Sequence, residues 1–339
     1  MPKMKAVQVA RAGGDFELVE RDIPEPGPDQ VRIRVSACGI CHSDRLVKEG
    51  HMPVAYPRIP GHEAVGTVDK VGTSVTTWKV GDRAGVGWHG GHCFVCDSCR
   101  RGYFQLCDKA LVTGLSHDGG YAEYMIASQH AVARVPDDLK FADAAPLMCA
   151  GITTYNALRN SGAQAGDLVA VQGIGGLGHL GIQFANKLGF RTAAISRGKS
   201  KEKLARELGA DLYLDGADGS IAEQLTALGG ARVILATAPN SKAIAEVIEG
   251  LGPNGLLIIA AAPGDSMEVS ALALIMRKRS IMGWYSGHAR DSEDTLNFSA
   301  LRGVLPRVEV FPLEKVNDAY ELMVSNRARF RVVLEMSGG

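Results

Sequence analysis

A strand, a glycine-rich turn and a helix follow one another directly near the middle of this chain. Leu168 to Gln172 is apolar enough for a buried strand, and Leu180 to Leu188 has the apolar spacing of a helix. The turn between them reads Gly173, Ile174, Gly175, Gly176, Leu177, Gly178. In a dinucleotide fingerprint such glycines allow a tight turn, close approach to a pyrophosphate and close helix packing. The phosphates then meet the free amides of the helix N-terminus.

The alternation of strand and helix continues beyond this turn. Further strands are predicted at 192–195, 213–214, 232–236, 256–260 and 280–284, and helices at 200–208, 221–228 and 241–248. Six strands with helices between most of them predict a doubly wound parallel sheet. Residues 150–287 are therefore expected to form a dinucleotide-binding Rossmann domain.

The end of the second strand of this domain bears on which dinucleotide binds. A carboxylate about twenty residues past the fingerprint would bind the adenosine ribose of NAD. This chain has Ser196 and Arg197 there, followed by Lys199 and Lys201. Because a guanidinium can pair bidentately with a 2′-phosphate, Ser196, Arg197 and Lys201 favour NADP over NAD. These cations can also be the solvated first turn of the next helix, but that would leave the missing acid unexplained.

The part of the chain before this region reads as short strands and turns. Strands are predicted at 17–20, 31–37 and 66–71, and a proline-rich loop at 24–28. The tail after Trp284 has two short helical stretches and a final strand at 330–335, and it is too short to fold alone. We therefore expect residues 1–149 and 288–339 to form one β-rich domain, with the cofactor domain inserted between them.

Four cysteines are crowded into the β-rich domain. They are Cys93, Cys96, Cys99 and Cys107. Thiolates at these intervals can converge on one tetrahedral zinc ion, which closes the coordination shell and makes the site structural. Two disulfides would require an oxidising compartment, and a zinc ribbon for nucleic acid would require a basic surround that this domain lacks. The spacing predicts a structural zinc.

A second set of metal-binding residues comes earlier in the chain. Cys41 and His62 supply a thiolate and an imidazole, whereas a catalytic zinc keeps three protein ligands and an open fourth position. A third ligand must come from elsewhere in the sequence. The one cysteine far downstream is Cys149.

Composition limits the partners and the location. The chain has 37 lysine and arginine residues and 37 aspartate and glutamate residues, so it has no excess of positive charge that would favour binding of nucleic acid. No stretch is long and apolar enough to span a bilayer, and residues 1–9 alternate like a strand and lack the apolar core of a signal peptide. Seven cysteines without an export signal indicate metal binding sooner than disulfides. The protein is expected to be cytoplasmic.

Together these motifs resemble the zinc-dependent alcohol dehydrogenases of the medium-chain dehydrogenase/reductase family over essentially the whole chain. The most specific match is to the zinc signature of that family, carried here by Gly61, His62, Glu63, Gly66, Gly72 and Val75. Cys41, His42, Ser43 and Asp44 resemble its first-ligand motif, and the four crowded cysteines match its structural-zinc lobe. The resemblance implies a GroES-like β-rich catalytic domain beside the Rossmann domain, two zinc ions per chain, and a homo-oligomer, either a dimer or a tetramer.

The resemblance also implies roles for single residues. Cys149 is the third catalytic ligand, Glu63 is a carboxylate that can approach the metal, and Asp44 orients His62. Ser43 accepts and relays the alcohol proton. Cofactor contacts are implied for the fingerprint residues and for His42, Thr153, Ala260, Ala262 and Arg331. The reaction implied is reversible hydride transfer between a small alcohol and the nicotinamide, giving an aldehyde or ketone.

One departure from the family concerns the proton relay. Relatives often carry a histidine where this chain has Leu46, so the proton must leave through His51 or through His42 and a cofactor ribose. Trp88 and Trp284 are candidate pocket walls, although such aromatic residues are more often core. Two rival functions stay open: a polyol or amino-alcohol dehydrogenase of the same family, and a non-catalytic redox sensor that binds zinc and dinucleotide. The open ligand set argues against the sensor.

Overall fold

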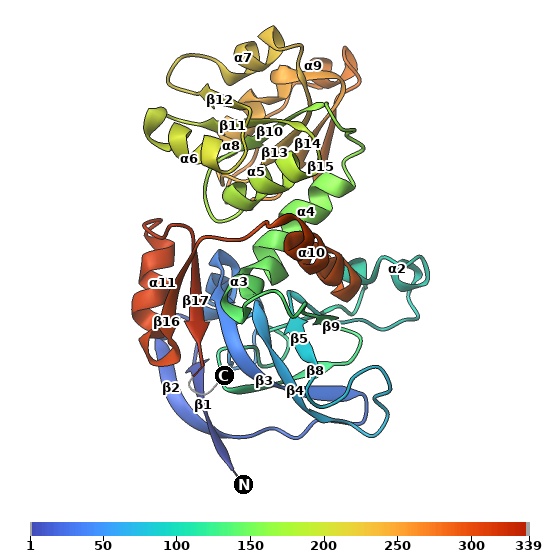
Figure 1. The fold of residues 1–339 in the computed structure, drawn as a ribbon, viewed down its shortest axis with the longest axis vertical. Coiled ribbons are helices and arrows are strands. Elements are labelled where there is room, and N and C mark those ends of the chain that lie inside the picture. Colours follow the sequence, from blue (N-terminus) through green and yellow to red (C-terminus); the bar gives the residue numbers. More distant parts are fainter. Residues whose placement is uncertain (1, 337–339) are drawn as a thin grey trace. The chain divides into compact units, whose positions relative to one another are not determined.

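The chain folds into two compact units. The computed structural model describes residues 2–336. The first unit combines Met1–Cys149 with Ser286–Gly339, and the second unit is the continuous stretch Ala150–Tyr285. The colours of Figure 1 show the same division, with both ends of the sequence in one unit and its middle in the other.

The first unit is built mainly from short strands. They are β1 (Lys3–Val9), β2 (Phe16–Asp22), β3 (Gln30–Ile40), β4 (Ala64–Val71), β5 (Arg83–Val86), β6 (His89–Gly91), β7 (Leu111–Val112), β8 (Tyr124–Ser128), β9 (Val132–Arg134), β16 (Val308–Pro312) and β17 (Arg331–Glu335). The largest sheet has seven strands, in the order β16-β17-β3-β4-β5-β9 with β8 also pairing with β3. Strand β3 is the centre of this sheet, because β4, β8 and β17 all pair with it.

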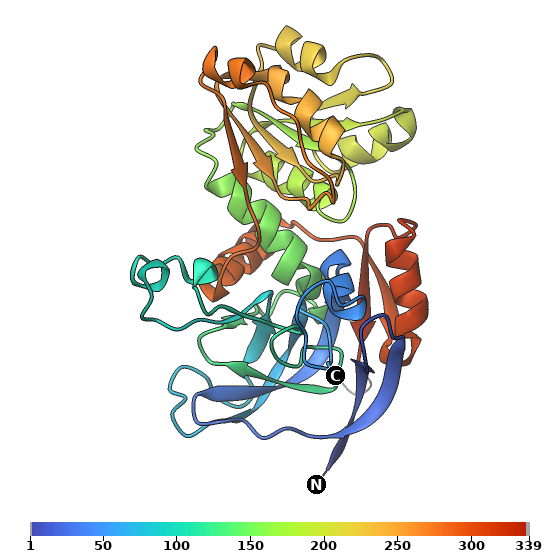
Figure 2. The same ribbon diagram turned by 180° about the vertical axis from the view of Figure 1, so that it is seen from behind.

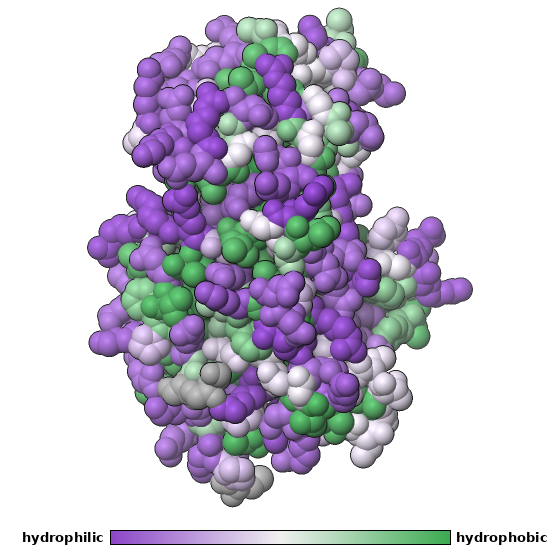
Figure 3. Space-filling model, viewed as in Figure 1, coloured by the Kyte–Doolittle hydropathy of each residue, from purple (hydrophilic) through white to green (hydrophobic). Residues whose placement is uncertain are grey.

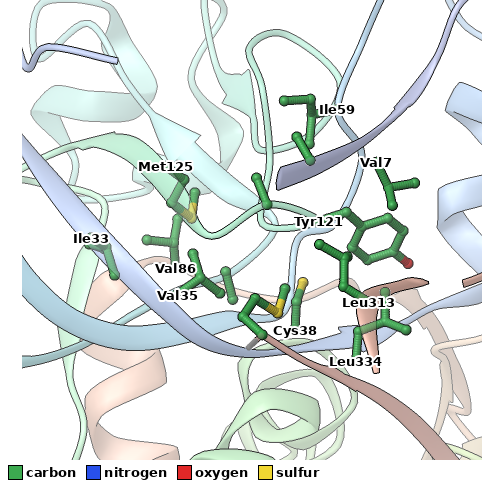
Figure 4. Packing of buried hydrophobic residues seen from close by; sticks show 14 of the residues in the cluster. Val7, Ile33, Val35, Cys38, Ile59, Val86, Tyr121, Met125, Leu313 and Leu334 are labelled. Atoms are coloured by element: carbon green, nitrogen blue, oxygen red, sulfur yellow. The ribbon is translucent and has the colours of Figure 1, made fainter. Parts of the chain in front are cut away.

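Buried and exposed side chains alternate along the central strand, so one face of β3 packs against the core of the first unit. In β3, Val31, Ile33 and Val35 are buried, while the residues between them are at least partly exposed. Figure 4 shows Ile33 and Val35 from β3 packed with Val86 and Met125. The strand becomes buried on both faces as it approaches its carboxyl end, where Cys41 follows.

The tail contributes more regular structure to the first unit than the sequence predicted. The helices are α1 (Arg45–Lys48), α2 (Asp97–Arg100), α3 (Phe141–Pro146), α10 (Ala289–Arg302) and α11 (Val316–Val324). Helix α10 is not short, since it has 14 residues, and strand β16 was not predicted. In β16, Val308, Glu309 and Val310 are exposed or only half-buried, so the strand lacks the run of buried residues that would mark it.

The second unit alternates strand and helix throughout. Its elements are α4 (Ile152–Arg159), β10 (Leu168–Gln172), α5 (Gly178–Lys187), β11 (Arg191–Ser196), α6 (Glu202–Glu207), β12 (Leu212–Asp215), α7 (Ile221–Ala227), β13 (Ala231–Ala236), α8 (Ser241–Glu246), β14 (Leu251–Ile259), α9 (Ala271–Ile275) and β15 (Ser280–Gly283). All of the predicted strands are present, with boundaries that move by a few residues.

The six strands of this unit form one parallel sheet in the order β12-β11-β10-β13-β14-β15. Helices cover both faces of the sheet, as the front and rear views in Figure 1 and Figure 2 show. The strand order reverses between β10 and β13, and ligands of such sheets bind at this switch point, at the carboxyl ends of the strands. The predicted doubly wound parallel sheet is confirmed.

Within residues 2–336, none of the helices combines the length and the apolar character that crossing a lipid bilayer requires.

Candidate zinc centres and dinucleotide site

The first candidate metal site forms where three segments of the first unit meet. Cys41 directly follows β3, and His62 and Glu63 directly precede β4. Antiparallel pairing of β3 with β4 sets Cys38 opposite Ala64, so the end of one strand lies beside the beginning of the other. Cys149 comes from a π-helical turn, Leu147–Gly151, between α3 and α4. A π-helical turn is frequent at functional sites because it redirects side chains from the regular helical faces.

The side chains at this meeting point have the separations of zinc ligands. One ligand atom each from Cys41, His62, Glu63 and Cys149 lies within 4.8 Å of the others. The sulfur atoms of Cys41 and Cys149 are 3.8 Å apart. Two thiolates that share a tetrahedral zinc, each at about 2.3 Å from it, would be separated by about 3.8 Å. The spacing therefore fits a shared zinc ion.

The imidazole of His62 is oriented for metal binding. Its Nδ1 lies 3.0 Å from Oδ1 of Asp44, and both side chains are buried. Its Nε2 is buried and has no hydrogen-bond partner among the described residues. Asp44 holds Nδ1 as the donor, so the lone pair of Nε2 is free, as is usual for a histidine ligand. A metal ion is the partner that such a buried nitrogen lacks.

Glu63 is held beside the thiols by an arginine from the other end of the chain. Arg331, in β17, donates a hydrogen bond to Oε1 of Glu63 and another to the Ile40 carbonyl at 3.2 Å. Oε2 of Glu63 is buried and has no hydrogen-bond partner within residues 2–336. Space for this oxygen exists because residue 39 is glycine: a Cβ there would lie 1.9 Å from it. The free oxygen gives the cluster a carboxylate that can approach a metal.

Burial and contacts between the side chains shift the pKa values of this cluster, and they shift them in opposite directions. The hydrogen bond between the two thiols lowers the pKa of Cys41 and raises the pKa of Cys149. Burial raises the pKa of Glu63 to about 7, although Arg331 opposes this change. A group of buried acids that cannot all ionise together is the environment that a divalent cation stabilises.

Trp88 contacts this cluster, whereas the predicted relay residues are placed by their local structure. The indole of Trp88 meets the ring of His62 edge to face, with ring centroids 5.0 Å apart. Ser43 is half-buried in the 3₁₀ turn His42–Asp44, and His42 is exposed in the same turn. Nε2 of His51 lies 3.3 Å from a carboxylate oxygen of Glu49. Trp88, a candidate pocket wall from the sequence, therefore lies beside a candidate metal ligand.

The second candidate metal site is the lobe that connects β6 to β7. Ligand atoms of Cys93, Cys96, Cys99 and Cys107 lie within 4.8 Å of one another, and the sulfurs of Cys96 and Cys107 are 3.9 Å apart. This separation also matches a tetrahedral zinc with four sulfur ligands. A full set of four thiols leaves no position for substrate.

Backbone amides lie close to sulfurs of this lobe. The amides of Cys93 and Lys109 lie 3.3 Å from the sulfur of Cys107. Amides of the following residues lower the pKa of Cys93 to about 6, whereas burial raises the pKa of Cys99 to about 12. Apolar side chains, including Phe94, Val95 and Leu106, cover the outside of the lobe and are exposed, and Figure 3 shows apolar surface around α2.

The glycine-rich turn lies at the switch point of the parallel sheet in the second unit. Gly173 follows β10 with a φ of +94°, and a Cβ on Gly178 would lie 1.8 Å from the Gly173 carbonyl oxygen. At Gly175 a Cβ would meet nothing within 4 Å, so the space above this residue is open. Helix α5 begins at Gly178 and directs its free amides toward this space. The turn fits the pyrophosphate of a dinucleotide.

The other predicted cofactor residues of this unit lie mostly at the same edge of the sheet. Ser196 ends β11, and Ala260 follows β14 with Ala262 two residues further on. Nζ of Lys201 donates to the Ile174 carbonyl of the glycine-rich turn at 2.8 Å. Arg197 is exposed next to Ser196. Thr153 is buried in α4 of this unit, whereas His42 and Arg331 belong to the first unit.

Comparison with known proteins agrees with this arrangement. Residues 27–137 match the family described as alcohol dehydrogenase GroES-like domain, and residues 176–300 match the family described as zinc-binding dehydrogenase. The alcohol dehydrogenase patD of Penicillium expansum is 44% identical over 96% of this chain and 95% of its own length.

Solved structures share the fold over nearly the full length. The CAD of Helicobacter pylori complexed with NADP(H) superposes with a TM-score of 0.88 and 26% identity, covering 99% of each chain. An NAD-dependent alcohol dehydrogenase superposes with a TM-score of 0.90 and 27% identity, covering 98% of this chain and 99% of that one. The chain belongs to the zinc-dependent alcohol dehydrogenases of the medium-chain dehydrogenase/reductase family.

Proposed function

We propose that this enzyme oxidises small alcohols reversibly with NADP, using a catalytic zinc held by Cys41, His62 and Cys149. The observation that carries the proposal is the 3.8 Å separation of the two sulfurs beside the unpartnered Nε2 of His62. When bound there, zinc supplies a Lewis acid for the substrate oxygen. A second zinc, held by the four cysteines of the lobe, would be structural.

The side chains around the metal divide the remaining work. Asp44 orients His62, and Arg331 holds one oxygen of Glu63 so that the other can approach the metal. Ser43 would accept the proton of the alcohol hydroxyl while it passes its own hydroxyl proton toward solvent, through His51 or through His42 and a ribose hydroxyl of the cofactor. Trp88 bounds the substrate on the side of His62. A dinucleotide held at the glycine-rich turn of residues 173–178 would supply the hydride acceptor.

The preference for NADP rests on the loop after β11. The carboxylate of Asp215 contacts this loop, and its Oδ1 accepts hydrogen bonds from the amides of Gly198 at 2.6 Å and Ala217 at 2.8 Å. This oxygen is therefore occupied by backbone amides. Ser196 and the exposed guanidinium of Arg197 are left for the adenosine end of the cofactor, where they suit a 2′-phosphate.

We propose in addition that the protein is a homo-oligomer, a dimer or a tetramer. Strand β15 lies at the edge of the six-stranded sheet, and an edge strand offers free backbone groups to another strand. Nearby in sequence, α9 and its end expose Leu272, Ile275 and Met276 at 63%, 73% and 73%. An exposed apolar face beside an edge strand suits a second copy. Six of the seven unpaired thiols lie in the two proposed metal clusters and must stay reduced to bind metal, which supports a cytoplasmic location.

Metal analysis of two variants tests the catalytic site. Wild-type protein should contain two zinc ions per chain and turn over alcohols with NADP. Cys41→Ser should contain one zinc and lose turnover while keeping its far-ultraviolet circular dichroism. Cys38→Ala is the matched control, because Cys38 is also a buried thiol but lies in neither cluster. A Cys41→Ser protein that keeps both zinc ions and its activity would refute the ligand assignment.

A further inference from the structure

A buried tyrosine completes the hydrogen bonds of the carboxylate that orients His62. Three donors reach Asp44: His62 Nδ1 contacts Oδ1, while the Cys41 amide at 2.8 Å and the hydroxyl of Tyr121 at 2.7 Å contact Oδ2. Asp44 is only 2% exposed, so water cannot replace these donors. Tyr121 comes from the segment that precedes β8, far from the other three residues in sequence.

The chain around Tyr121 is built to hold this ring in place. The amides of Gly119, Gly120 and Tyr121 donate to the carbonyls of Ile59, Gly61 and Pro60, at 2.7, 2.9 and 3.0 Å. These contacts join the segment to the residues immediately before His62. The ring itself is fully buried, and Figure 4 shows it flanked by Val7 and Leu313.

Glycine at position 61 makes room for the ring. Its φ is +97°, and a Cβ there would lie 2.4 Å from Cδ1 of Tyr121. A real Cβ does not approach a ring atom so closely, so the ring and the residue before His62 interlock. The aromatic ring therefore packs against the residue that precedes the candidate ligand His62, and its hydroxyl donates a hydrogen bond to Asp44.

We propose that Tyr121 is a positioning residue for the catalytic zinc, acting through Asp44 on His62. The inference rests on the proposed ligands Cys41, His62 and Cys149. A hydrogen bond to a buried carboxylate is charge-assisted, so the phenol stabilises Asp44 as an anion. An anionic Asp44 accepts from Nδ1 of His62, which keeps Nε2 free and makes the imidazole a stronger donor to the metal. Without the phenol, one oxygen of Asp44 would keep only the Cys41 amide.

The rate of zinc release tests this chain of contacts independently of catalysis. Removing a partner of a metal-bound histidine usually weakens metal binding by about 10- to 100-fold. Since Tyr121 acts through Asp44, we expect Tyr121→Phe to release one zinc about tenfold faster to a chromophoric chelator. The zinc of the four-cysteine lobe should leave at the wild-type rate.

Tyr56→Phe is the matched control for this experiment. The Tyr56 hydroxyl donates to the Val47 carbonyl at 2.6 Å in the same unit, and it does not contact Asp44. This variant loses a tyrosine hydrogen bond of similar length, and both of its zinc ions should leave at wild-type rates. Equal release from Tyr121→Phe and Tyr56→Phe would overturn the proposal.

A double-mutant cycle identifies the route through Asp44. Asp44→Asn should speed release by itself, and adding Tyr121→Phe to it should have little further effect. If Tyr121→Phe alone does not fold, it should fold in the Asp44→Asn background, where no buried charge needs the phenol. Additive effects, or failure to fold in that background as well, would assign the tyrosine to packing only.

The metal content of Cys41→Ser separates the two proposals. If this variant keeps two zinc ions, the proposed ligands Cys41, His62 and Cys149 are wrong, and the proposed role of Tyr121 is wrong as well. If it keeps one zinc ion while Tyr121→Phe behaves like Tyr56→Phe, the ligand set stands and only the role of Tyr121 is overturned.

Discussion

Arg331 donates a hydrogen bond to the carboxylate of Glu63 in the interior of the first unit, where their side chains are 6% and 0% exposed. The pair joins β17, near the end of the chain, to the residue after the proposed ligand His62. Neither residue can be removed alone without depriving its buried partner of this contact, because both side chains are almost inaccessible to solvent.

Removing the guanidinium should therefore be costly. Breaking a buried ion pair by removing one partner typically costs about 3–5 kcal/mol, so we expect Arg331→Leu to lower the free energy of unfolding by about this amount. The measurement is urea-induced unfolding of the zinc-loaded protein. Glu63→Gln in the same chain should recover part of the loss, because no unpaired charge is then buried. A cost below about 1 kcal/mol for Arg331→Leu would place the pair in contact with solvent.

The lobe of four cysteines should be needed for folding and not for substrate binding. Structural zinc contributes folding energy directly, so Cys96→Ser should lose one zinc and melt at a lower temperature. Ser98→Ala in the same lobe is the control and should keep both zinc ions. Differential scanning fluorimetry with metal analysis would check this. Unchanged melting and zinc content in Cys96→Ser would mean that the lobe holds no structural ion.

Cofactor preference should depend on the guanidinium after β11. A hydrogen bond between charged groups is worth about 1.5–3 kcal/mol, so Arg197→Ala should lower kcat/KM for NADP by about tenfold or more. The value for NAD, which has no 2′-phosphate, should hardly change. Arg206→Ala removes another positive charge of the same region, which pairs with Glu202 in α6, and should affect neither value. Equal losses for both cofactors would contradict the proposed NADP site.

Acid should destabilise the protein through His89 at the start of β6. Burial, with a smaller contribution from His92, lowers the pKa of His89 to about 4. The unfolded chain, with a histidine pKa of about 6.5, binds more protons than the folded chain below that pH, so stability falls as the pH drops from about 6.5 to about 4. This group should cost about 2 kcal/mol between pH 7 and pH 5.

The variant His89→Phe isolates this contribution. Phenylalanine keeps an aromatic ring against His92, whose ring lies 5.1 Å away, and it does not titrate. The fall in melting temperature between pH 7 and pH 5 should be smaller in His89→Phe than in wild type. An equal fall in the two proteins would show that His89 takes up no extra proton on unfolding.

Local sequence patterns predicted the second unit well because its signals are local. The apolar run at 168–172 and the glycines that follow are adjacent in sequence, so strand, turn and helix could be predicted together. The exposed strand β16 and the full length of α10 had no comparable pattern and were missed. The parallel pairing of β16 with β17 depends on a partner that follows it after a helix.

The contacts within the candidate metal site were harder to predict from the sequence. Cys41, His62 and Cys149 could be selected through the resemblance to a family, but Tyr121 could not. It lies 77 residues after Asp44, and nothing about a tyrosine after two glycines indicates a carboxylate partner. Its hydrogen bond depends on how the segment before β8 packs against residues 59–61, which is decided by tertiary structure.

The close approach of position 61 to the ring of Tyr121 has a consequence for how this protein can evolve. A methyl group gained at position 61 would occupy the volume of the ring, so it would require a smaller residue at position 121, and the backbone φ of +97° would have to change as well. The glycine should therefore be retained wherever the tyrosine is retained among descendants of this sequence. A lineage that gives up the glycine would give up the phenol as well, and would have to supply Asp44 with another donor.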